Sequence, residues 1–293
     1  MREKRRAGMS ELITEVVSDI EGEMNIKDYL RHRLGLSSTF IKRAKYGGVR
    51  LDGVAVTMRA TVKNGDLLTV TPPSEASEIL PADAPIYPVY EDEWLLAFDK
   101  PVGMPTHPSR GNSLPTLAEG VMTYMGNPFV FRAVNRLDRD TSGLVLVAKN
   151  QLAAAALSRS LAGGRVEKHY IAKVVGVPRE SHGIIDLPIR RMSDDSIKRI
   201  IAPDGKTALT KWSLIESDGE KSLLSVQPVT GRTHQIRVHL SHVGLPLYAD
   251  FLYGEQVEGE CYFLRCHKLI FPHPKSNEII EISAELNEKP RQT

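Results

Sequence analysis

The chain has 293 residues, which is long enough for two domains at the usual size of about 150 residues each. Hydrophobic residues make up 41% and charged residues 25%, so the composition is that of a globular protein and excludes a disordered, collagen-like or coiled-coil chain. The formal net charge of +2 is too small to imply a polyanionic partner from the total alone. Such a partner has to be inferred from the distribution of charge along the chain.

The sequence lacks the features of a disulfide-rich, zinc-binding or membrane-spanning protein. Its two cysteines, Cys261 and Cys266, have no second pair with which to complete a zinc site. No segment approaches the ~18 apolar residues of a membrane span, and the basic start is not followed by an apolar signal segment. We therefore expect a soluble, cytoplasmic protein without a metal.

Charge is segregated along the chain. Residues 24–63 contain nine Lys or Arg and two acidic residues, which is an excess of seven positive charges. Residues 74–99 contain seven acidic residues and no Lys or Arg, and their prolines prevent a continuous helix. This reversal predicts a division into an N-terminal tail over 1–23, a basic module over 24–73, an acidic, Pro-rich linker over 74–86, a larger domain over 87–287 and a C-terminal tail over 288–293.

Within the basic module, the pattern predicts two short helices followed by small strands. Apolar residues of 26–36 recur at helical spacing, and Ser37 or Ser38 can cap a second helix over 39–46. Asp52-Gly53 is a turn signal between the strands that follow. The module is therefore expected to be a small α+β unit.

Strands dominate the larger domain. The pattern predicts a strand over 89–101, a helix of strong helix formers over 151–164 and another helix over 232–244. Asp204-Gly205 predicts a hairpin within 199–216. Because the strands follow one another by hairpins instead of alternating with helices, we expect an α+β fold with a mixed, largely antiparallel sheet and flanking helices.

The densest group of reactive side chains is the segment 135–143, Asn-Arg-Leu-Asp-Arg-Asp-Thr-Ser-Gly, which directly precedes an apolar strand. A polar loop on a rigid strand is a good mount for catalytic groups. Arg136 and Arg139 flank Asp138 and favour its carboxylate form, which can act as a nucleophile or a base. The alternative is a solvated turn with Asx-type hydrogen bonds, and this segment alone does not decide between the two.

A second group of polar side chains lies on the predicted helix over 232–244, where Arg232, His234 and Arg237 follow a glycine. Ile236 and Leu240 are one turn apart and must pack inward, so Arg237 lies beside the buried stripe. A partly buried arginine needs a carboxylate or phosphate partner, whereas the alternative is an exposed basic helix face. The histidines of this segment lack the spacing and the carboxylate of a metal set.

Nucleotide-binding motifs are missing from the sequence. It contains no phosphate-binding loop, no dinucleotide fingerprint and no nucleophile elbow, so the chemistry would use side chains without a cofactor. Tyr170 lies on a predicted strand, where a tyrosine is by default a packing residue with its hydroxyl at the rim.

Together these segments resemble, in order, the RluA-type family of RNA pseudouridine synthases from about residue 87 to 285. The similar segments are 89–109, 135–150, 167–176, 228–250 and 263–274. One departure is Asn135, which stands where the family usually has His. Residues 24–73 resemble an S4-type RNA-binding module, with Ser38 at a usual Arg and Leu51-Asp52-Gly53 at a usual Val-Asn-Gly.

The resemblance implies a pseudouridine-synthase-type fold and the isomerisation of uridine to its C-glycoside, which needs no cofactor or metal. Asp138 matches the catalytic aspartate, Arg237 matches the arginine paired with it, and Tyr170 matches the tyrosine that stacks on the target base. Because the uridine must leave the RNA stack, Arg136 is expected to occupy the vacated place. Whether Asp138 attacks the sugar, attacks the base or removes a ribose proton stays open.

The expected partner is RNA, ribosomal or transfer RNA, and the expected oligomeric state is a monomer. Further RNA contacts are expected in both parts of the chain, namely Arg139, Arg232 and His234 in the larger domain and Lys42, Arg43 and Lys45 in the basic module.

Two other functions compete with this interpretation. A glycoside hydrolase would use Asp138 and Asp140 as paired carboxylates, but residues two apart in an extended loop face opposite ways, and Arg139 between them favours an RNA contact. A non-catalytic RNA-binding or ribosome-assembly factor would keep the fold without the activity. Retention of Asp138, Tyr170 and Arg237 together weighs against it.

Overall fold

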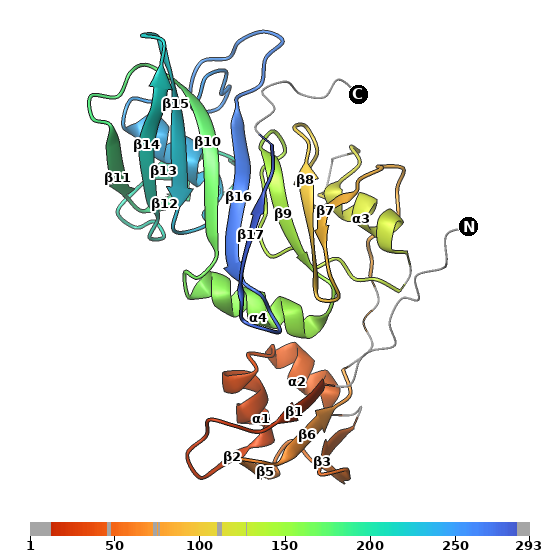
Figure 1. The fold of residues 1–293 in the computed structure, drawn as a ribbon. Coiled ribbons are helices and arrows are strands. Elements are labelled where there is room, and N and C mark those ends of the chain that lie inside the picture. Colours follow the sequence, from red (N-terminus) through yellow and green to blue (C-terminus); the bar gives the residue numbers. More distant parts are fainter. Residues whose placement is uncertain are drawn as a thin grey trace.

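The computed structural model describes residues 13–45, 48–72, 75, 77–109, 113–126 and 128–285. It contains a small N-terminal module and a larger domain built on one extended sheet, and helix α4 (Gln151–Ala162) lies at the end of the larger domain that faces the module (Figure 1).

The module has two small sheets and two short helical segments. Its four-stranded sheet has the order β1-β6-β3-β4, with β1 at Ile13–Val16, β6 at Leu67–Val70, β3 at Val49–Leu51 and β4 at Val54–Val56. The second sheet pairs β2 (Glu23–Asn25) with β5 (Thr61–Lys63). The helices are α1 (Ile26–Asp28), which continues as a π-helical turn over Tyr29–Arg33, and α2 (Ser38–Ala44).

The capping prediction for the second helix is confirmed, because the Ser37 hydroxyl accepts a hydrogen bond from the Phe40 backbone N–H at 3.0 Å. The predicted boundary of the N-terminal tail is wrong. Strand β1 pairs antiparallel with β6, and Ile13 and Val17 are 2% and 1% exposed within the core of the module. Strand β1 therefore covers an edge of β6 that would otherwise be unpaired. Residues 1–12 of the predicted tail lie outside the described residues.

The module contacts the larger domain through α4. Leu152 and Ala155 pack against the hydrophobic core of the module, and the Arg159 guanidinium donates to the backbone carbonyl of Leu34. Gly35 has a φ of +64°, and a Cβ there would lie within 2.8 Å of three atoms of the Arg159 side chain. A glycine at this position permits both the left-handed backbone and the close approach.

The described part of the larger domain has one nine-stranded sheet, in which β16 and β9 form the one parallel pair. The strand order is β11-β14-β15-β10-β16-β9-β8-β7, and β17 pairs with β16. The bounds are β7 Pro88–Glu91, β8 Leu95–Lys100, β9 Ser142–Ala148, β10 Glu167–Val175, β11 His182–Asp186, β14 Leu209–Ser217, β15 Lys221–Pro228, β16 Leu264–Pro272 and β17 Ile279–Ser283. The predicted mixed, largely antiparallel α+β fold is confirmed.

Helices pack against this sheet. They are α3 (Leu117–Met125), α4 and α5 (Gln235–His242), of which α4 and α5 occupy the two segments predicted to be helical. Helix α3 begins with a capping box, in which the Thr116 hydroxyl accepts from the Glu119 N–H and the Glu119 carboxylate accepts from the Thr116 N–H. The central strands β8 and β9 are almost completely buried.

Two strand predictions are wrong. Segment 89–101 is not one strand but the hairpin β7–β8, because the Asp92 carboxylate accepts from two backbone N–H groups of the turn, at 2.6 and 2.8 Å. The hairpin predicted within 199–216 does not form either. Strand β13 (Arg199–Ile201) pairs with β12 (Ile189–Arg191), while β14 pairs with β11 and β15.

The end of the predicted linker packs on the larger domain. Ala84 and Ile86 are buried, and the Thr123 hydroxyl of α3 donates to the Ala82 carbonyl at 2.6 Å. A Cβ on Gly120 would lie 2.5 Å from the Ala84 carbonyl oxygen, so the glycine lets this segment pack directly on α3. Residues 82–86 are therefore part of the packed domain and not a free spacer.

Candidate active site

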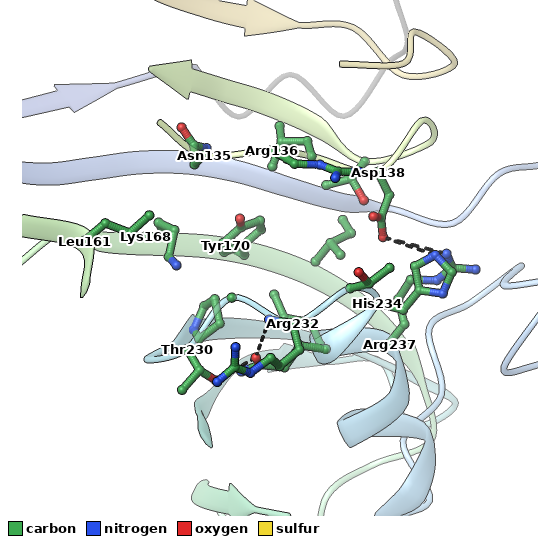
Figure 2. A pocket seen from close by; sticks show the side chains of 18 of the residues that line it. Asn135, Arg136, Asp138, Leu161, Lys168, Tyr170, Thr230, Arg232, His234 and Arg237 are labelled. Carbon is green, nitrogen blue, oxygen red and sulfur yellow. Dashed lines mark hydrogen bonds and ion pairs between the residues drawn. The ribbon is translucent and has the colours of Figure 1, made fainter. Parts of the chain in front are cut away.

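One cavity of about 310 Å³ brings together residues from the two polar segments that the sequence singled out (Figure 2). It lies between the loop before β9, strand β10 and the start of α5. Six of the predicted site residues line it, namely Arg136, Asp138, Tyr170, Arg232, His234 and Arg237.

Asn135 anchors the loop that carries Asp138. Its buried side-chain amide donates to the Leu144 carbonyl at 3.0 Å, and its side-chain oxygen accepts from the Leu146 N–H at 2.9 Å. Both hydrogen bonds reach β9, so the start of the loop is fastened to a buried strand. The asparagine at this position therefore has a positional function in this chain.

The segment after β8 holds the same loop from the other side. The buried Thr106 hydroxyl donates to the Leu137 carbonyl at 2.8 Å and accepts from the Leu137 N–H at 3.2 Å. The residue before Asp138 is thus bonded through both of its backbone groups.

Lys100 is fully buried behind the loop. Its ammonium donates to three backbone carbonyls, those of Pro101, Met104 and Arg139, at 2.9, 2.7 and 3.0 Å. Burial lowers the pKa of Lys100 to about 7, against the opposing effect of nearby aspartates. Lys100 therefore connects the segment after β8 to the residue that follows Asp138.

The Asp138 carboxylate is partly open to the cavity and faces two basic side chains. Its Oδ2 lies 3.9 Å from His234 Nε2 and 3.9 Å from Arg237 Nη1. Burial lowers the pKa of His234, so Arg237 is the permanent positive charge beside Asp138. His234 has a φ of +57°, and its Nδ1 lies 2.8 Å from the Tyr253 hydroxyl, which fixes the ring.

Arg237 has a closer partner than the predicted one. Its Nε and Nη2 donate to the two carboxylate oxygens of Asp250 at 2.7 and 2.6 Å. The guanidinium is surrounded by the rings of Tyr262, Tyr253 and Phe251, at 4.5, 5.0 and 5.8 Å from their centroids. Burial would lower the pKa of Arg237, but the hydrogen bonds to Asp250 raise it above its usual value. The predicted approach to Asp138 is present, but as a longer contact at 3.9 Å.

Sequence reasoning missed Asp250. This residue is completely buried, and its Oδ1 also accepts from the N–H groups of Leu252 and Tyr253 at 3.0 and 3.2 Å. The signal in the sequence was a single Asp among apolar residues at the end of segment 228–250, without an indication of its partner.

Tyr170 forms one wall of the cavity. It lies on β10 and is 7% exposed, and burial raises the pKa of its hydroxyl well above the usual value. The hydroxyl lies beside the buried thiol of Cys266 on β16. The ring is therefore the part of Tyr170 that is available to the cavity.

Arg139 and Asp140 form their own ion pair. Arg139 donates through Nε and Nη2 to the two Asp140 oxygens at 2.8 and 2.9 Å, and neither residue lines the cavity. Asp140 therefore does not combine with Asp138 as the carboxylate pair that a glycoside hydrolase would need.

The three predicted RNA contacts of the module lie away from the cavity. Lys42 and Arg43 are on α2 and Lys45 is its C-terminal cap, and all three are exposed. Their contact with RNA stays a prediction.

The residues that the structure describes contain no cluster of three or more His, Cys, Asp or Glu side chains arranged to bind a metal ion. Among the helices of the same residues, none is both long and apolar enough to cross a membrane.

Comparisons with known proteins identify the family of the chain. Residues 94–242 match the family model described as RNA pseudouridylate synthase. The chain is 37% identical to the uncharacterized RNA pseudouridine synthase YjbO of Bacillus subtilis, over 90% of this chain and 95% of that protein. It is 36% identical to ribosomal large subunit pseudouridine synthase D of Xanthomonas campestris, over 83% of this chain and 79% of that protein.

Similarity extends to another named enzyme and to a solved structure. Ribosomal large subunit pseudouridine synthase C of Vibrio parahaemolyticus is 30% identical over 96% of both chains. The structure of human RNA pseudouridylate synthase domain containing 1 superposes with a TM-score of 0.58 and 28% identity, covering 68% of this chain and 83% of the human one. The family model and these relatives together show that the chain belongs to the RluA type of the RNA pseudouridine synthases.

Proposed function

We propose that this synthase isomerises uridines of large-subunit ribosomal RNA and that Asp138 is its catalytic carboxylate. The observation that carries the catalytic assignment is the Asp138 carboxylate at the cavity wall, 3.9 Å from the buried Arg237. The named relatives that act on the large ribosomal subunit support the choice of substrate.

The charges of the cavity fit a nucleotide in RNA. Asp138 is the one acidic residue among the lining residues, against one histidine, His234, and four side chains that carry a positive charge, namely Arg136, Lys168, Arg232 and Arg237. A positively charged pocket attracts the RNA backbone, while a single carboxylate at the wall reaches the sugar or base of a nucleotide that has left the stack. Arg136 is exposed at the rim and can occupy the vacated place in the helix.

The reaction rearranges bonds within one nucleotide. The C1′–N1 bond breaks, the base turns and C5 bonds to C1′; C5 then gives up its proton to solvent or a basic group and N1 takes one up, so that no proton is gained or lost overall. Asp138 acts as nucleophile or as base in this sequence. Arg237 orients its carboxylate, and the Tyr170 ring supports the flipped base by stacking.

The N-terminal module is an S4-like RNA anchor in this proposal. Its exposed Lys42, Arg43 and Lys45 contact phosphates beyond the target nucleotide. The enzyme then works as a monomer, because one chain supplies both the anchor and the cavity, and it works in the cytoplasm.

The test is to map pseudouridines in total RNA from cells with and without the protein, and to complement the deletion with Asp138→Asn. We expect one or a few sites in large-subunit RNA to disappear with the deletion and to stay absent with Asp138→Asn. The matched control is Asp204→Asn, which removes an exposed carboxylate and should restore the sites. Loss of sites in transfer RNA alone would refute the ribosomal assignment, and restoration by Asp138→Asn would refute the catalytic one.

A further inference from the structure

Lys168 is a buried lysine that lines the cavity and has no function in the proposed reaction so far. It lies on β10 two residues before Tyr170, so both side chains are on the same face of the strand. In Figure 2, Tyr170 lies between Lys168 and Asp138, which places Lys168 at the end of the cavity away from the carboxylate.

The ammonium of Lys168 has no partner among the described residues. The side chain is 6% exposed and takes part in no hydrogen bond or ion pair with them. Burial lowers the pKa of Lys168, and the one opposing influence is the Cys266 thiol. That thiol is itself buried with its pKa raised to about 12, so it is neutral and does not balance the charge.

The approach to the ammonium is open from the cavity. A Cβ on Gly231 would lie 3.7 Å from Lys168 Nζ, so the glycine leaves space beside the nitrogen. A lysine without a counter-charge is costly to bury, and a ligand that supplies the missing partner offsets this cost when it binds.

We propose that Lys168 donates hydrogen bonds to the carbonyl oxygens of the uracil and stabilises the negative charge that the base carries when its glycosidic bond breaks. This inference rests on the proposed placement of the uridine, with the ribose at Asp138 and the base on Tyr170. In that placement the far edge of the base points to Lys168, whereas the phosphates stay at the mouth of the cavity, beyond a side chain that is 6% exposed.

The electron balance shows why a cation is useful there. When C1′–N1 breaks, the electron pair stays on the base as a uracil anion, whose charge is shared by N1, O2 and O4. The positive charge that this leaves on the sugar is compensated when the Asp138 carboxylate bonds to the sugar or removes a ribose proton. Lys168 transfers no proton, and its attraction grows as the charge forms, which lowers the barrier and not only the energy of the bound state.

The same donor suits the turning of the base. A half-turn of uracil about its N3–C6 axis exchanges C5 with N1 and also exchanges O4 with O2. An ammonium has three donors and no preferred plane, so it can hold O4 before the turn and O2 after it. It has no acceptor for the amino group of cytosine, which disfavours that base.

The experiment compares the wild type with Lys168→Met on a transcript that carries the mapped uridine, in single turnover at saturating enzyme. We expect the rate to fall by about 10²–10³-fold, the usual effect of losing one donor to a developing oxyanion, with RNA affinity retained. The matched control is Lys173→Met, an exposed lysine on the other face of β10, which should leave the rate unchanged.

A second substrate isolates the charge on the base. In a transcript with 5-fluorouridine at the target, fluorine stabilises the uracil anion, so the defect of Lys168→Met in consuming the nucleoside should be about tenfold smaller. Lys168→Arg keeps the charge and should retain more activity than Lys168→Gln. If Lys168→Met does not fold, Lys168→Gln takes its place in both measurements.

Three results would overturn the proposal. A weaker RNA affinity with a salt dependence flatter by roughly 0.7–0.9, at an unchanged saturated rate, would make Lys168 a phosphate contact. Equal defects on uridine and 5-fluorouridine, together with a lowered Tm, would make its function structural. A wild-type rate for Lys168→Gln would show that the reaction does not need a positive charge at this position. If no pseudouridine depends on the wild-type protein, that result would instead contradict the proposed function.

Discussion

Arg237 is bonded through two nitrogens to Asp250, at 2.6 and 2.7 Å, whereas its nearest contact with Asp138 is 3.9 Å. Because Asp250 is completely buried, the guanidinium is fixed in direction before any substrate binds. One nitrogen, Nη1, is left to face Asp138. We therefore expect Asp250 to act as a positioning residue, which holds Arg237 apart from the Asp138 carboxylate.

The first prediction concerns Asp250→Asn. The change leaves a buried arginine without its counter-charge, so we expect the free energy of unfolding to fall by about 3–5 kcal/mol and the single-turnover rate to fall as well. Urea unfolding and a rate measurement at saturating RNA check both effects. Asp204→Asn, in an exposed pair, should cost less than about 1 kcal/mol.

A double variant separates position from stability. Arg237→Met with Asp250→Val removes both charges, and replacing a buried pair by apolar side chains is often neutral for stability. We expect it to recover stability relative to Asp250→Asn without recovering the rate. Recovery of both would mean that the pair contributes only to folding.

Sequence patterns predict contacts between residues that are close in the chain better than contacts between residues that are far apart in it. The pattern of Ile236 and Leu240 predicted α5 and the burial of Arg237, because a helix brings residues four apart together. Asp250 comes 13 residues after Arg237 and follows Ala249, whose φ is +61°. Such a turn in a residue other than glycine leaves no periodic signal.

Strand pairing shows the same limit. Asp204-Gly205 does form a turn, since the Gly205 N–H donates to the Ala202 carbonyl at 2.9 Å. The partner of β13 is nevertheless β12, which precedes it, because pairing is decided by packing and not by the turn alone. Likewise, the contact of Lys100 with Arg139 spans 39 residues.

The second prediction concerns pH. The pKa of Lys100 is about 7 in the folded protein against an ordinary value of 10.5, so between these pH values the unfolded chain binds a proton that the folded chain has lost. Through this group the free energy of unfolding therefore rises with pH across that window, and the gain is lost as pH falls through 7.

Urea unfolding at several pH values within this window checks the prediction. We expect a smaller increase for Lys100→Met than for the wild type, because the titrating group is gone. Lys173→Met controls for the loss of an exposed lysine and should follow the wild type. Parallel curves for Lys100→Met and the wild type would contradict the assignment.

The third prediction separates the ring of Tyr170 from its hydroxyl. The hydroxyl is buried beside Cys266 and its raised pKa keeps it protonated, so it is not available to take up a proton, and Tyr170→Phe should keep a rate within about threefold of the wild type. Tyr170→Leu removes the stacking surface, which is worth about 1–3 kcal/mol per base, so the rate should fall by about 5- to 150-fold. Tyr87→Leu, at a tyrosine that is 67% exposed, is the control. Equal rates for Leu and Tyr at position 170 would mean that the ring only packs.

The last prediction concerns the module. Lys42 and Lys45 share a face of α2 while Arg43 points about 100° away, so two or three phosphate contacts can arise. Each contact releases counterions, and replacing all three residues by Ala should flatten the dependence of log K on log[salt] by about 1.4–2.7. KM should rise, whereas the single-turnover rate at saturating RNA should stay nearly unchanged, because the cavity is intact.

The matched control removes three charges from the larger domain. Lys173, Arg179 and Lys211 are exposed, and Lys173 and Lys211 alternate with strand residues that face inward, so they lie on the face of the sheet opposite to the cavity. Replacing these three by Ala changes the net charge equally but should leave the slope and KM near the wild-type values. If both triple variants flatten the slope alike, the effect is one of net charge. If the module variant changes neither slope nor KM on structured RNA, the module is not an RNA anchor, and its contact with α4 serves the fold alone.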